Sequence, residues 1–472
     1  MNAIWLLTRH QFTEWRRSKL LYVFVFTFAC LWIFCLYTGL LAYRSVAAMR
    51  ENAGRESRGQ WLNQDRKHPH IAAHFGNFAF KQVNPLSIFD NGTDAYTGTY
   101  VYMEAHRQND VLFSPAQSTS SLVRFGSFNI ALLLQVFVPL FLIVLTFNTI
   151  ISERISGTLA LLKSSGISSR QLAVGKVFAP WLLVAMVVAL FYMLSAIVLV
   201  VERVDFVSQD VLKTAAIFCF YLAYYFVVTV LGVYVSTVAG SVKQSLIVLL
   251  SGWVFACILV PKLVANVATG LYPLPSNTEF KTVVMKDIVN GIDGHNTSDK
   301  RALALTKQML KKYKVDSTSK LPINIEGIIM MEGEKYSSKV YNDHFDQLSR
   351  VLLKQQKVFA FTSLLDPLLG IKNLSMGLSN TDYFNDRAFR LDAESYRMNF
   401  VQTMNRDMAL HSKEDGFTTY KIGRELFNSI PQFSYRSLNA AQSLKNYVPE
   451  IMSLLLLTVL SGLMVKRIAY KL

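Results

Sequence analysis

Six long apolar runs constrain this chain more than any other feature of its sequence. Each of the first five is long enough to cross the roughly 30 Å hydrocarbon core of a bilayer as a helix. The sixth is shorter and carries Pro449 and Glu450 near its start. Because 52% of the residues are hydrophobic, the runs are not isolated accidents of composition. We predict transmembrane helices at residues 20–43, 128–150, 178–201, 214–238, 245–268 and 446–465.

Basic residues predict how these helices are oriented. The formal net charge of +16 would suggest a nucleic-acid partner in a soluble protein. Here much of the basic excess lies beside the spans, in residues 1–19, 151–177, 239–244 and 466–472, as the positive-inside rule requires. We therefore expect these segments, and both termini, in the cytoplasm, and no nucleic-acid partner. The first apolar run is too long for a cleaved signal peptide, so we expect it to stay in the membrane.

Two long segments are then expected on the opposite, extracytoplasmic side. Residues 44–127 are too many for a simple loop and too apolar for a disordered one. Residues 269–445 show helical periodicity interrupted by proline and glycine. Pro261 and Lys262 suggest that the helix of the fifth span breaks near its outer end. The prediction is an all-α integral membrane protein with six transmembrane helices and two extracytoplasmic, mainly helical domains. The N-terminal segment fits a short interfacial helix or a charged flank.

The cytoplasmic segment between the second and third spans is the most informative one. Its apolar spacing predicts a short amphipathic helix with Ile155, Leu159 and Leu162 on one face. Gly166 interrupts this helix, and Ser168 and Ser169 are suited to cap a second helical turn that leads into the third span. Such a helix lies along the membrane surface or docks on a soluble partner.

The same segment contains an acidic residue, a Gly-Thr-Leu step and a closing Gly-Lys. The residues that carry this pattern are Glu153, Gly157, Thr158, Leu159, Leu162, Gly175 and Lys176. The pattern resembles the signature of the ABC-2 family of ATP-binding-cassette transporter permeases, in which it forms a coupling helix that contacts the ATPase. Many members have proline after that helix, where this chain has Gly166.

Part of the first extracytoplasmic segment supports a closer resemblance. Its strings are His68-Pro69-His70, His74-Phe75-Gly76, Pro85-Leu86, Phe89-Asp90 and Glu104-Ala105-His106-Arg107-Gln108-Asn109. Together with the spacing of the spans, they look like a subgroup of these permeases known mainly as a domain of unknown function. The resemblance does not supply a substrate.

The resemblance implies a bacterial inner-membrane exporter driven by a separate ATPase subunit, which would bind ATP and Mg²⁺. Two permeases, either identical or similar, would pair, with membrane lipid around them and a possible extracytoplasmic partner. The chain itself is expected to be no enzyme and to hold no cofactor. A phosphate-binding loop would need Gly-Lys-Ser/Thr after an earlier glycine, whereas Gly175-Lys176 is followed by Val177 and preceded by Arg170 at the glycine position.

Two alternatives remain open. In the first, ATP hydrolysis moves the outer domains to act on an extracytoplasmic partner or lipoprotein without transport through the spans. In the second, the chain is a metal-handling or enzymatic membrane protein centred on His68, His70, His74 and His106. Pro69 and the lack of a strong metal-binding spacing favour structural histidines, so no metal site is predicted from the sequence.

Overall fold

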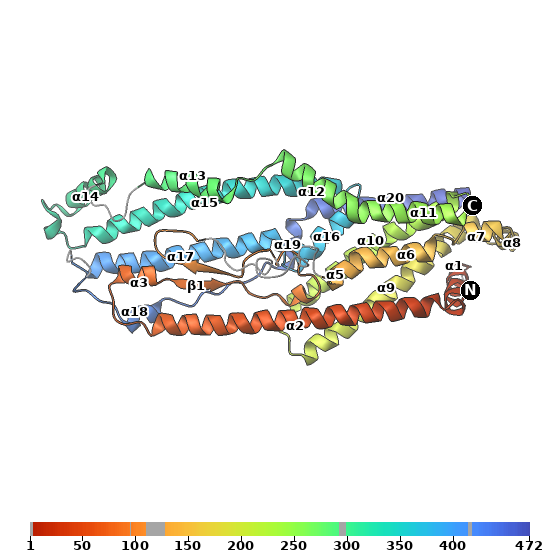
Figure 1. Ribbon diagram of the computed structural model, residues 1–472, viewed down its shortest axis with the longest axis horizontal. Coiled ribbons are helices and arrows are strands. Elements are labelled where there is room, and N and C mark those ends of the chain that lie inside the picture. The colour runs from red at the N-terminus through yellow and green to blue at the C-terminus, as the bar shows by residue number, and fades with distance from the viewer. Residues whose placement is uncertain (1–2, 95, 110–127, 292–298, 414–417) are drawn as a thin grey trace.

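Both ends of the chain lie at the same end of an elongated, mostly helical molecule (Figure 1). The computed structural model describes residues 3–94, 96–109, 128–291, 299–413 and 418–472. Within these residues, six helices are long and apolar enough to cross a membrane, which confirms the predicted number and makes this a multi-pass membrane protein. They are Leu20–Leu62, Ile130–Ile155, Ser169–Val201, Ser208–Val238, Val242–Leu271 and Val448–Lys471.

The first half of the described chain supplies the first five spans and a small sheet. Its elements are α1 (Ala3–Arg17), α2 (Leu20–Leu62), α3 (Pro69–Phe75), β1 (Asn77–Phe80), η1 (Pro85–Ile88), β2 (Tyr100–Met103), α5 (Ile130–Leu132), η3 (Leu133–Phe137), α6 (Val138–Thr146), α7 (Ile151–Ile155), α8 (Thr158–Ser164), α9 (Ser169–Val201), α10 (Ser208–Val238), α11 (Val242–Val254), η4 (Phe255–Leu259) and α12 (Val260–Leu271).

The second half is helical and ends in the last span. Its elements are α13 (Asn277–Val289), α14 (Lys300–Tyr313), η5 (Thr318–Lys320), α15 (Ile325–Thr362), α16 (Pro367–Leu378), α17 (Tyr383–His411), α18 (Arg424–Ser429), α19 (Ala440–Lys445) and α20 (Val448–Lys471).

Helix α2 is much longer than the apolar run that predicts it. It has 43 residues and therefore extends about 65 Å, roughly twice the thickness of a hydrocarbon core. Residues 44–62 were predicted as the polar beginning of a separate domain, but they continue the helix of the first span. This stretch contains neither proline nor a run of β-branched residues, so nothing ends the helix where the apolar composition stops.

The fifth span also differs from its prediction. The helix does not break at Pro261 but continues through α11, η4 and α12 to Leu271. The π-helical turn η4 ends two residues before Pro261, and η3 ends two residues before Pro139 in the second span. Proline has no N–H and its ring collides with the carbonyl four residues earlier. A wider turn just before each proline accommodates both the missing N–H and the bulk of the ring, so these helices continue.

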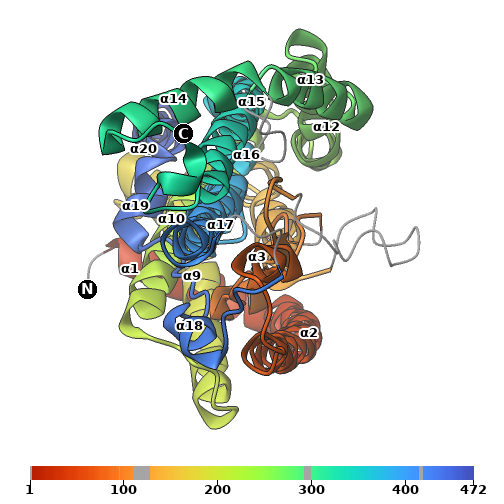
Figure 2. The ribbon, with the colours of Figure 1, turned by 90° about the vertical axis from the view of Figure 1, so that its left-hand side faces the viewer.

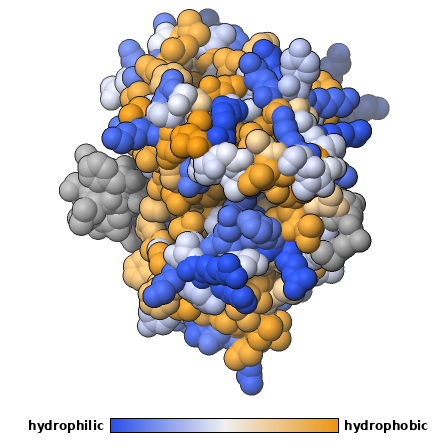
Figure 3. Space-filling model, turned by 90° about the vertical axis from the view of Figure 1, so that its right-hand side faces the viewer, coloured by the Kyte–Doolittle hydropathy of each residue, from blue (hydrophilic) through white to orange (hydrophobic). Residues whose placement is uncertain are grey.

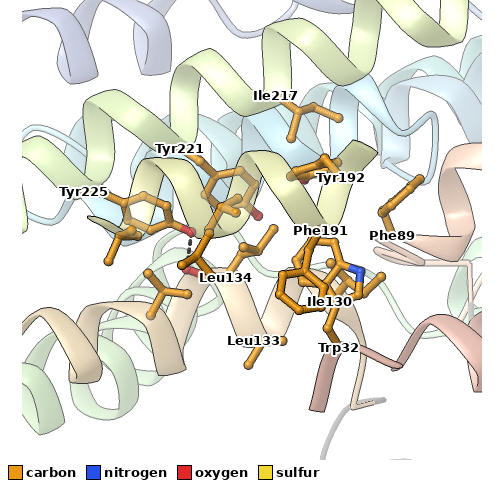
Figure 4. Close-up of a cluster of buried hydrophobic side chains, with 14 of the residues drawn as sticks. Trp32, Phe89, Ile130, Leu133, Leu134, Phe191, Tyr192, Ile217, Tyr221 and Tyr225 are labelled. Carbon is orange, nitrogen blue, oxygen red and sulfur yellow. Dashed lines mark hydrogen bonds between the residues drawn. The ribbon is translucent and has the colours of Figure 1, made fainter. Parts of the chain in front are cut away.

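Backbone carbonyl groups of η3 accept hydrogen bonds from tyrosine side chains of α10. Tyr225 donates a hydrogen bond to the carbonyl oxygen of Leu134 at 3.0 Å (Figure 4). Tyr224 donates to that of Gln135 at 3.0 Å. These tyrosines are buried in the main hydrophobic core between the spans. The core therefore fixes the second span against the fourth by hydrogen bonds as well as by packing.

We use the term distal region for the described residues within 44–109 and 272–447, which lie toward the end of the molecule away from the termini (Figure 1). The two segments predicted as separate domains pack against each other there. Helix α3 lies on α17, and α15 runs beside α17 (Figure 2). Trp61, at the end of α2, is fully buried against Phe400 of α17 and Phe427 of α18.

The distal region is not wholly helical. Strands β1 and β2 pair antiparallel, with Asn77 opposite Met103 and Phe80 opposite Tyr100. Ala79, Val101 and Met103 from this sheet pack on α17. The prediction of mainly helical domains therefore missed a two-stranded sheet that holds the end of the first segment against the second.

Candidate functional site

The segment that resembles a coupling helix forms two short helices, the last turn of the second span and a helix beyond it. Helices α7 and α8, with Ser156 and Gly157 between them, are called the tip below (Figure 1). Gly157 has φ of +77°, a left-handed conformation that costs a residue with a side chain roughly 1–2 kcal/mol. The predicted single helix is therefore broken at Gly157, and its two halves present different faces.

This break changes which apolar side chains are accessible. Leu159 points inward and packs on Leu7 of α1 and Leu172 of α9, with 9% of its surface exposed. Ile155 and Leu161 point outward, with 66% and 68% of their surfaces exposed. Leu159 and Leu162 lie together as predicted, but Ile155 does not share their face. The accessible apolar pair was missed because a helical wheel drawn over the whole segment ignores the break.

A buried ion pair holds the base of the tip. Lys176 on α9 pairs with Glu153 on α7, and its Nζ donates to Oε1 of Gln11 on α1 at 3.0 Å. The side chains of Lys176 and Glu153 are only 5% and 15% exposed. The helices α1, α7 and α9 therefore meet at one ammonium group.

The close approach of α1 to α9 depends on Gly175. A Cβ atom at this position would lie 3.0 Å from Cβ and from Cδ1 of Leu7. Only glycine allows this distance without displacing α1. The matched Gly-Lys step thus has a structural role: the glycine admits α1, and the lysine ties it to α7.

The remaining residues of the pattern shape the turns of the tip. The Thr158 hydroxyl lies within hydrogen-bonding distance of Ser156 at the start of α8, and Leu162 is half-buried beside Leu159. Gly166 has φ of +87° and lies in the turn after α8. Ser168 caps α9 with a reciprocal hydrogen-bond pair to Gln171, as predicted. The third span therefore begins only a few residues after the tip ends.

The carboxyl end of α10 supports the tip from the other side. The hydroxyl oxygen of Ser236 accepts hydrogen bonds from the backbone N–H groups of Ile150 and Ile151 at 3.1 and 3.3 Å. Arg154 donates to the carbonyl oxygen of Thr237 at 2.6 Å. Contacts from α1, α9 and α10 therefore make the tip an extension of the bundle rather than a loose loop.

The four candidate histidines lie in the distal region, at the other end of the molecule. His70 and His74 on α3 lie beside His106, which follows β2, and the possible ligand nitrogens of these three residues all lie within 4.8 Å of one another. His68 is not in this group, because its Nδ1 accepts a hydrogen bond from the backbone N–H of His70 and caps α3. The structure thus brings three of the four together.

A buried carboxylate that the sequence analysis missed stands behind His106. Oε1 of Glu334 lies 2.8 Å from Nδ1 of His106, and Arg397 donates to Oε2 of Glu334 at 3.2 Å. Burial raises the pKa of Glu334, but the hydrogen bonds and charges of His106 and Arg397 outweigh it and leave that pKa below its ordinary value. Because 228 residues separate Glu334 from His106, no local spacing could have indicated this pair.

The comparisons with known proteins cover only part of the chain. The family model described as Domain of unknown function (DUF3526) matches residues 278–436. Neither a curated protein nor a solved structure matches the chain. The matched range includes Glu334 and Arg397 on α15 and α17, and it leaves out the tip and the three histidines.

Proposed function

We propose that this chain is the membrane-spanning permease subunit of an ATP-binding-cassette exporter, driven by a separate ATPase subunit that docks on the tip. The observation that carries the proposal is the tip itself, where Ile155 and Leu161 are exposed on a segment braced by the bundle. Apolar side chains held outward on a rigid support are suited to insertion into a partner's groove. The resemblance to the ABC-2 signature supports an ATPase subunit as that partner.

The bracing of the tip supports a role in force transfer. A push on α8 would pass to α9 through the short capped turn at Ser168, and to α1 through Lys176 and Gln11. Helix α9 is one of the spans, and α1 leads directly into α2. Because packed helices move as rigid bodies, docking at the tip is suited to shifting the first and third spans together.

The proposed setting is a bacterial inner membrane, with the tip and both termini in the cytoplasm and the distal region outside. Charges on and beside the tip agree with this orientation, since Arg154 and Lys163 are exposed on the tip and Arg170 at the start of α9. The end of the molecule that carries the tip presents hydrophilic and hydrophobic side chains side by side (Figure 3). ATP and Mg²⁺ would bind to the ATPase subunit, so this chain would be no enzyme by itself.

Two poorly buried spans offer room for a second permease copy or for lipid. Only 11% of the most apolar part of Val242–Leu271 is buried within the chain, and only 22% of that of Val448–Lys471. In contrast, 61% of the corresponding part of Ile130–Ile155 is buried. A paired permease would cover part of this exposed apolar surface, and lipid chains would cover the rest.

Co-purification from the native membrane tests the proposal. The tagged chain should bring down an ATPase subunit, identified by mass spectrometry and by ATP turnover, and Leu161→Asp should lose it. Leu410→Asp is the matched control, because Leu410 is 55% exposed on α17 at the opposite end of the molecule. Leu159→Asp would not serve, since Leu159 is buried and its replacement would also disturb α1 and α9.

Loss of the ATPase with Leu161→Asp and its retention with Leu410→Asp would support docking at the tip. If the unaltered chain brings down no ATPase, the permease proposal fails. Equal retention by both variants would show that the ATPase docks elsewhere on the chain.

The length of α2 favours a second candidate, in which ATP hydrolysis moves the distal region without transport through the spans. One continuous helix joins α1, beside the tip, to Trp61 in the distal core. Structures of the complex with and without nucleotide would separate the two candidates. A passage that opens between paired permeases in one state would support export, and an interface sealed in every state would support mechanical transmission.

A further inference from the structure

Three imidazole rings surround a single point in the distal region. The ring centroids of His70, His74 and His106 are 4.7 to 5.3 Å apart. His70 and His74 are four residues apart on α3, so their side chains leave the same face of the helix. Nε2 of His70 lies 3.1 Å from Nε2 of His74. From this arrangement we infer that His70, His74 and His106 bind a divalent transition-metal ion, with Zn²⁺ as the best match.

The distances fit tetrahedral coordination after a small contraction. Zinc–imidazole bonds of about 2.0–2.1 Å place two ligand nitrogens about 3.3 Å apart. The His70–His74 separation of 3.1 Å is already close to this value. The third nitrogen lies within 4.8 Å of the other two and therefore needs to approach by at most about 1.5 Å.

The surroundings of His106 resemble the support that metal-binding histidines have. Its Nδ1 faces the buried carboxylate of Glu334 at 2.8 Å, so Nε2 would be the metal ligand. Glu334 is itself fixed by Arg397, whose guanidinium donates two hydrogen bonds of 2.8 Å to Glu394. A carboxylate behind the ligand makes the imidazole a better electron donor and fixes its tautomer.

The backbone at His106 is held in an unfavourable conformation. Its φ is +71°, in the left-handed region where a non-glycine residue costs roughly 1–2 kcal/mol. The backbone N–H of His106 donates to the same Oε1 of Glu334 that faces the ring, so one carboxylate holds both backbone and side chain. Strain maintained by a buried partner is typical of a residue whose direction matters for binding.

The site would leave one coordination position open. His70 is buried, His106 is half-buried and His74 is exposed, so the cluster reaches the surface on one side. Three protein ligands with an accessible fourth position are typical of zinc sites that exchange water or an external ligand, whereas structural sites use four protein ligands. The site is therefore suited to taking up an ion reversibly or to holding a ligand through it. This inference does not depend on ATPase docking, because the tip lies at the other end of the molecule.

Metal titration of the purified full-length chain tests the inference. After treatment with a chelator, the chain should bind one Zn²⁺ with micromolar or tighter affinity, measured by competition with a chromophoric indicator. Co²⁺ in its place should give the visible absorption bands of a tetrahedral site. His74→Ala and His106→Ala should each lose this binding, while Glu334→Gln should weaken it by about 10–100-fold. His344→Ala is the control, since His344 pairs with Asp287 and is not one of the three clustered rings.

Thermal melting separates lost ligands from lost folding. His74 is exposed, so His74→Ala should melt like the unaltered chain when no metal is present. Zn²⁺ should raise the melting temperature of the unaltered chain and of His344→Ala, and should leave that of His74→Ala unchanged. Absence of stoichiometric binding by the unaltered chain would overturn the inference, as would full retention of binding after replacement of both His74 and His106. Either result would assign the three rings to a hydrogen-bonded structural cluster.

Discussion

Replacement of Lys176 by methionine is the most direct test of how the tip is braced. Methionine keeps most of the length and apolar character of the lysine side chain and removes its charge. In Lys176→Met, the carboxylate of Glu153 would stay 85% buried without the ammonium group, and Gln11 would lose its 3.0 Å hydrogen bond. We expect both α1 and α7 to loosen from α9.

The size of the effect follows from the burial of the pair. Leaving one member of a fully buried ion pair without its partner costs about 3–5 kcal/mol. Glu153 retains 15% exposure, so the lower end, about 3 kcal/mol, applies. Glu153→Gln alone leaves the buried ammonium of Lys176 with Gln11 and should cost about 2–3 kcal/mol. The double variant has no buried charge and loses mainly hydrogen bonds, about 1 kcal/mol.

The assay is thermal melting of four purified proteins in the same detergent, followed by tryptophan fluorescence. Trp15 on α1 is 5% exposed and should report the release of this helix. The expected order of melting temperatures places the double variant below the unaltered chain and above both single variants. ATPase co-purification should follow the same order, because the tip must keep its direction to dock.

Two results would refute this reasoning. If Lys176→Met melts together with the unaltered chain, the buried pair does not brace the tip. If the double variant loses as much stability as the two single variants combined, Lys176 and Glu153 act independently. Recovery in the double variant is the result that only a direct interaction explains.

Three further predictions concern other parts of the chain. Trp61→Ala should lower the free energy of unfolding by about 3–5 kcal/mol, because the indole is fully buried and donates to the carbonyl oxygen of Phe427. Trp61→Phe should lower it by only about 1–2 kcal/mol. Thermal melting measures both, and equal effects would contradict a role for packing. Gly157→Ala should weaken ATPase co-purification more than Gly157→Asn, because asparagine tolerates a left-handed backbone and alanine does not; equal retention would show that the break is unimportant. Burial raises the pKa of Asp382 to about 6 from 3.8. Between these two pH values the folded chain binds more protons than the unfolded chain, so the stability that the protonated carboxyl gives is lost as the pH rises through about 6. At about pH 8, Asp382→Asn should therefore have a free energy of unfolding up to about 3 kcal/mol above that of the unaltered chain, and a higher melting temperature. The difference should shrink toward about pH 4, and a difference independent of pH would be inconsistent with this pKa.

The spans were predictable because membrane helices follow from composition alone. An apolar run long enough to cross the bilayer has few alternatives to a helix, since every backbone group must be satisfied without water. The end of α2 was not predictable by the same argument, because its last 19 residues are largely polar and hydrophobicity no longer reports helix length. Pro261 and Pro139 were visible in the sequence, but only the π-helical turns before them explain why neither ends its span.

The sequence predicted which residues form the tip, but not the conformation of the tip. Residue types located the pattern from Glu153 to Lys176, whereas the positive φ of Gly157 decided which side chains face outward. Contacts between distant segments were beyond reach for a different reason. Gln11 with Lys176, and Glu334 with His106, are separated by 165 and 228 residues, and only the packing of whole helices brings them together.

The two ends of the molecule are joined by elements with few places to bend. Beside the tip, Lys176 of α9 donates a hydrogen bond to Gln11 of α1. After Lys19 the chain continues from α1 into the single helix α2. At its far end, Trp61 packs on Phe400 of α17, the helix that also carries Arg397. Arg397 holds Glu334, and Glu334 holds His106. Physical continuity does not by itself establish energetic coupling. It does require that a displacement of α2 along its axis either moves α17 with it or breaks the packing around Trp61, because α2 is one continuous helix without a proline at which it would kink.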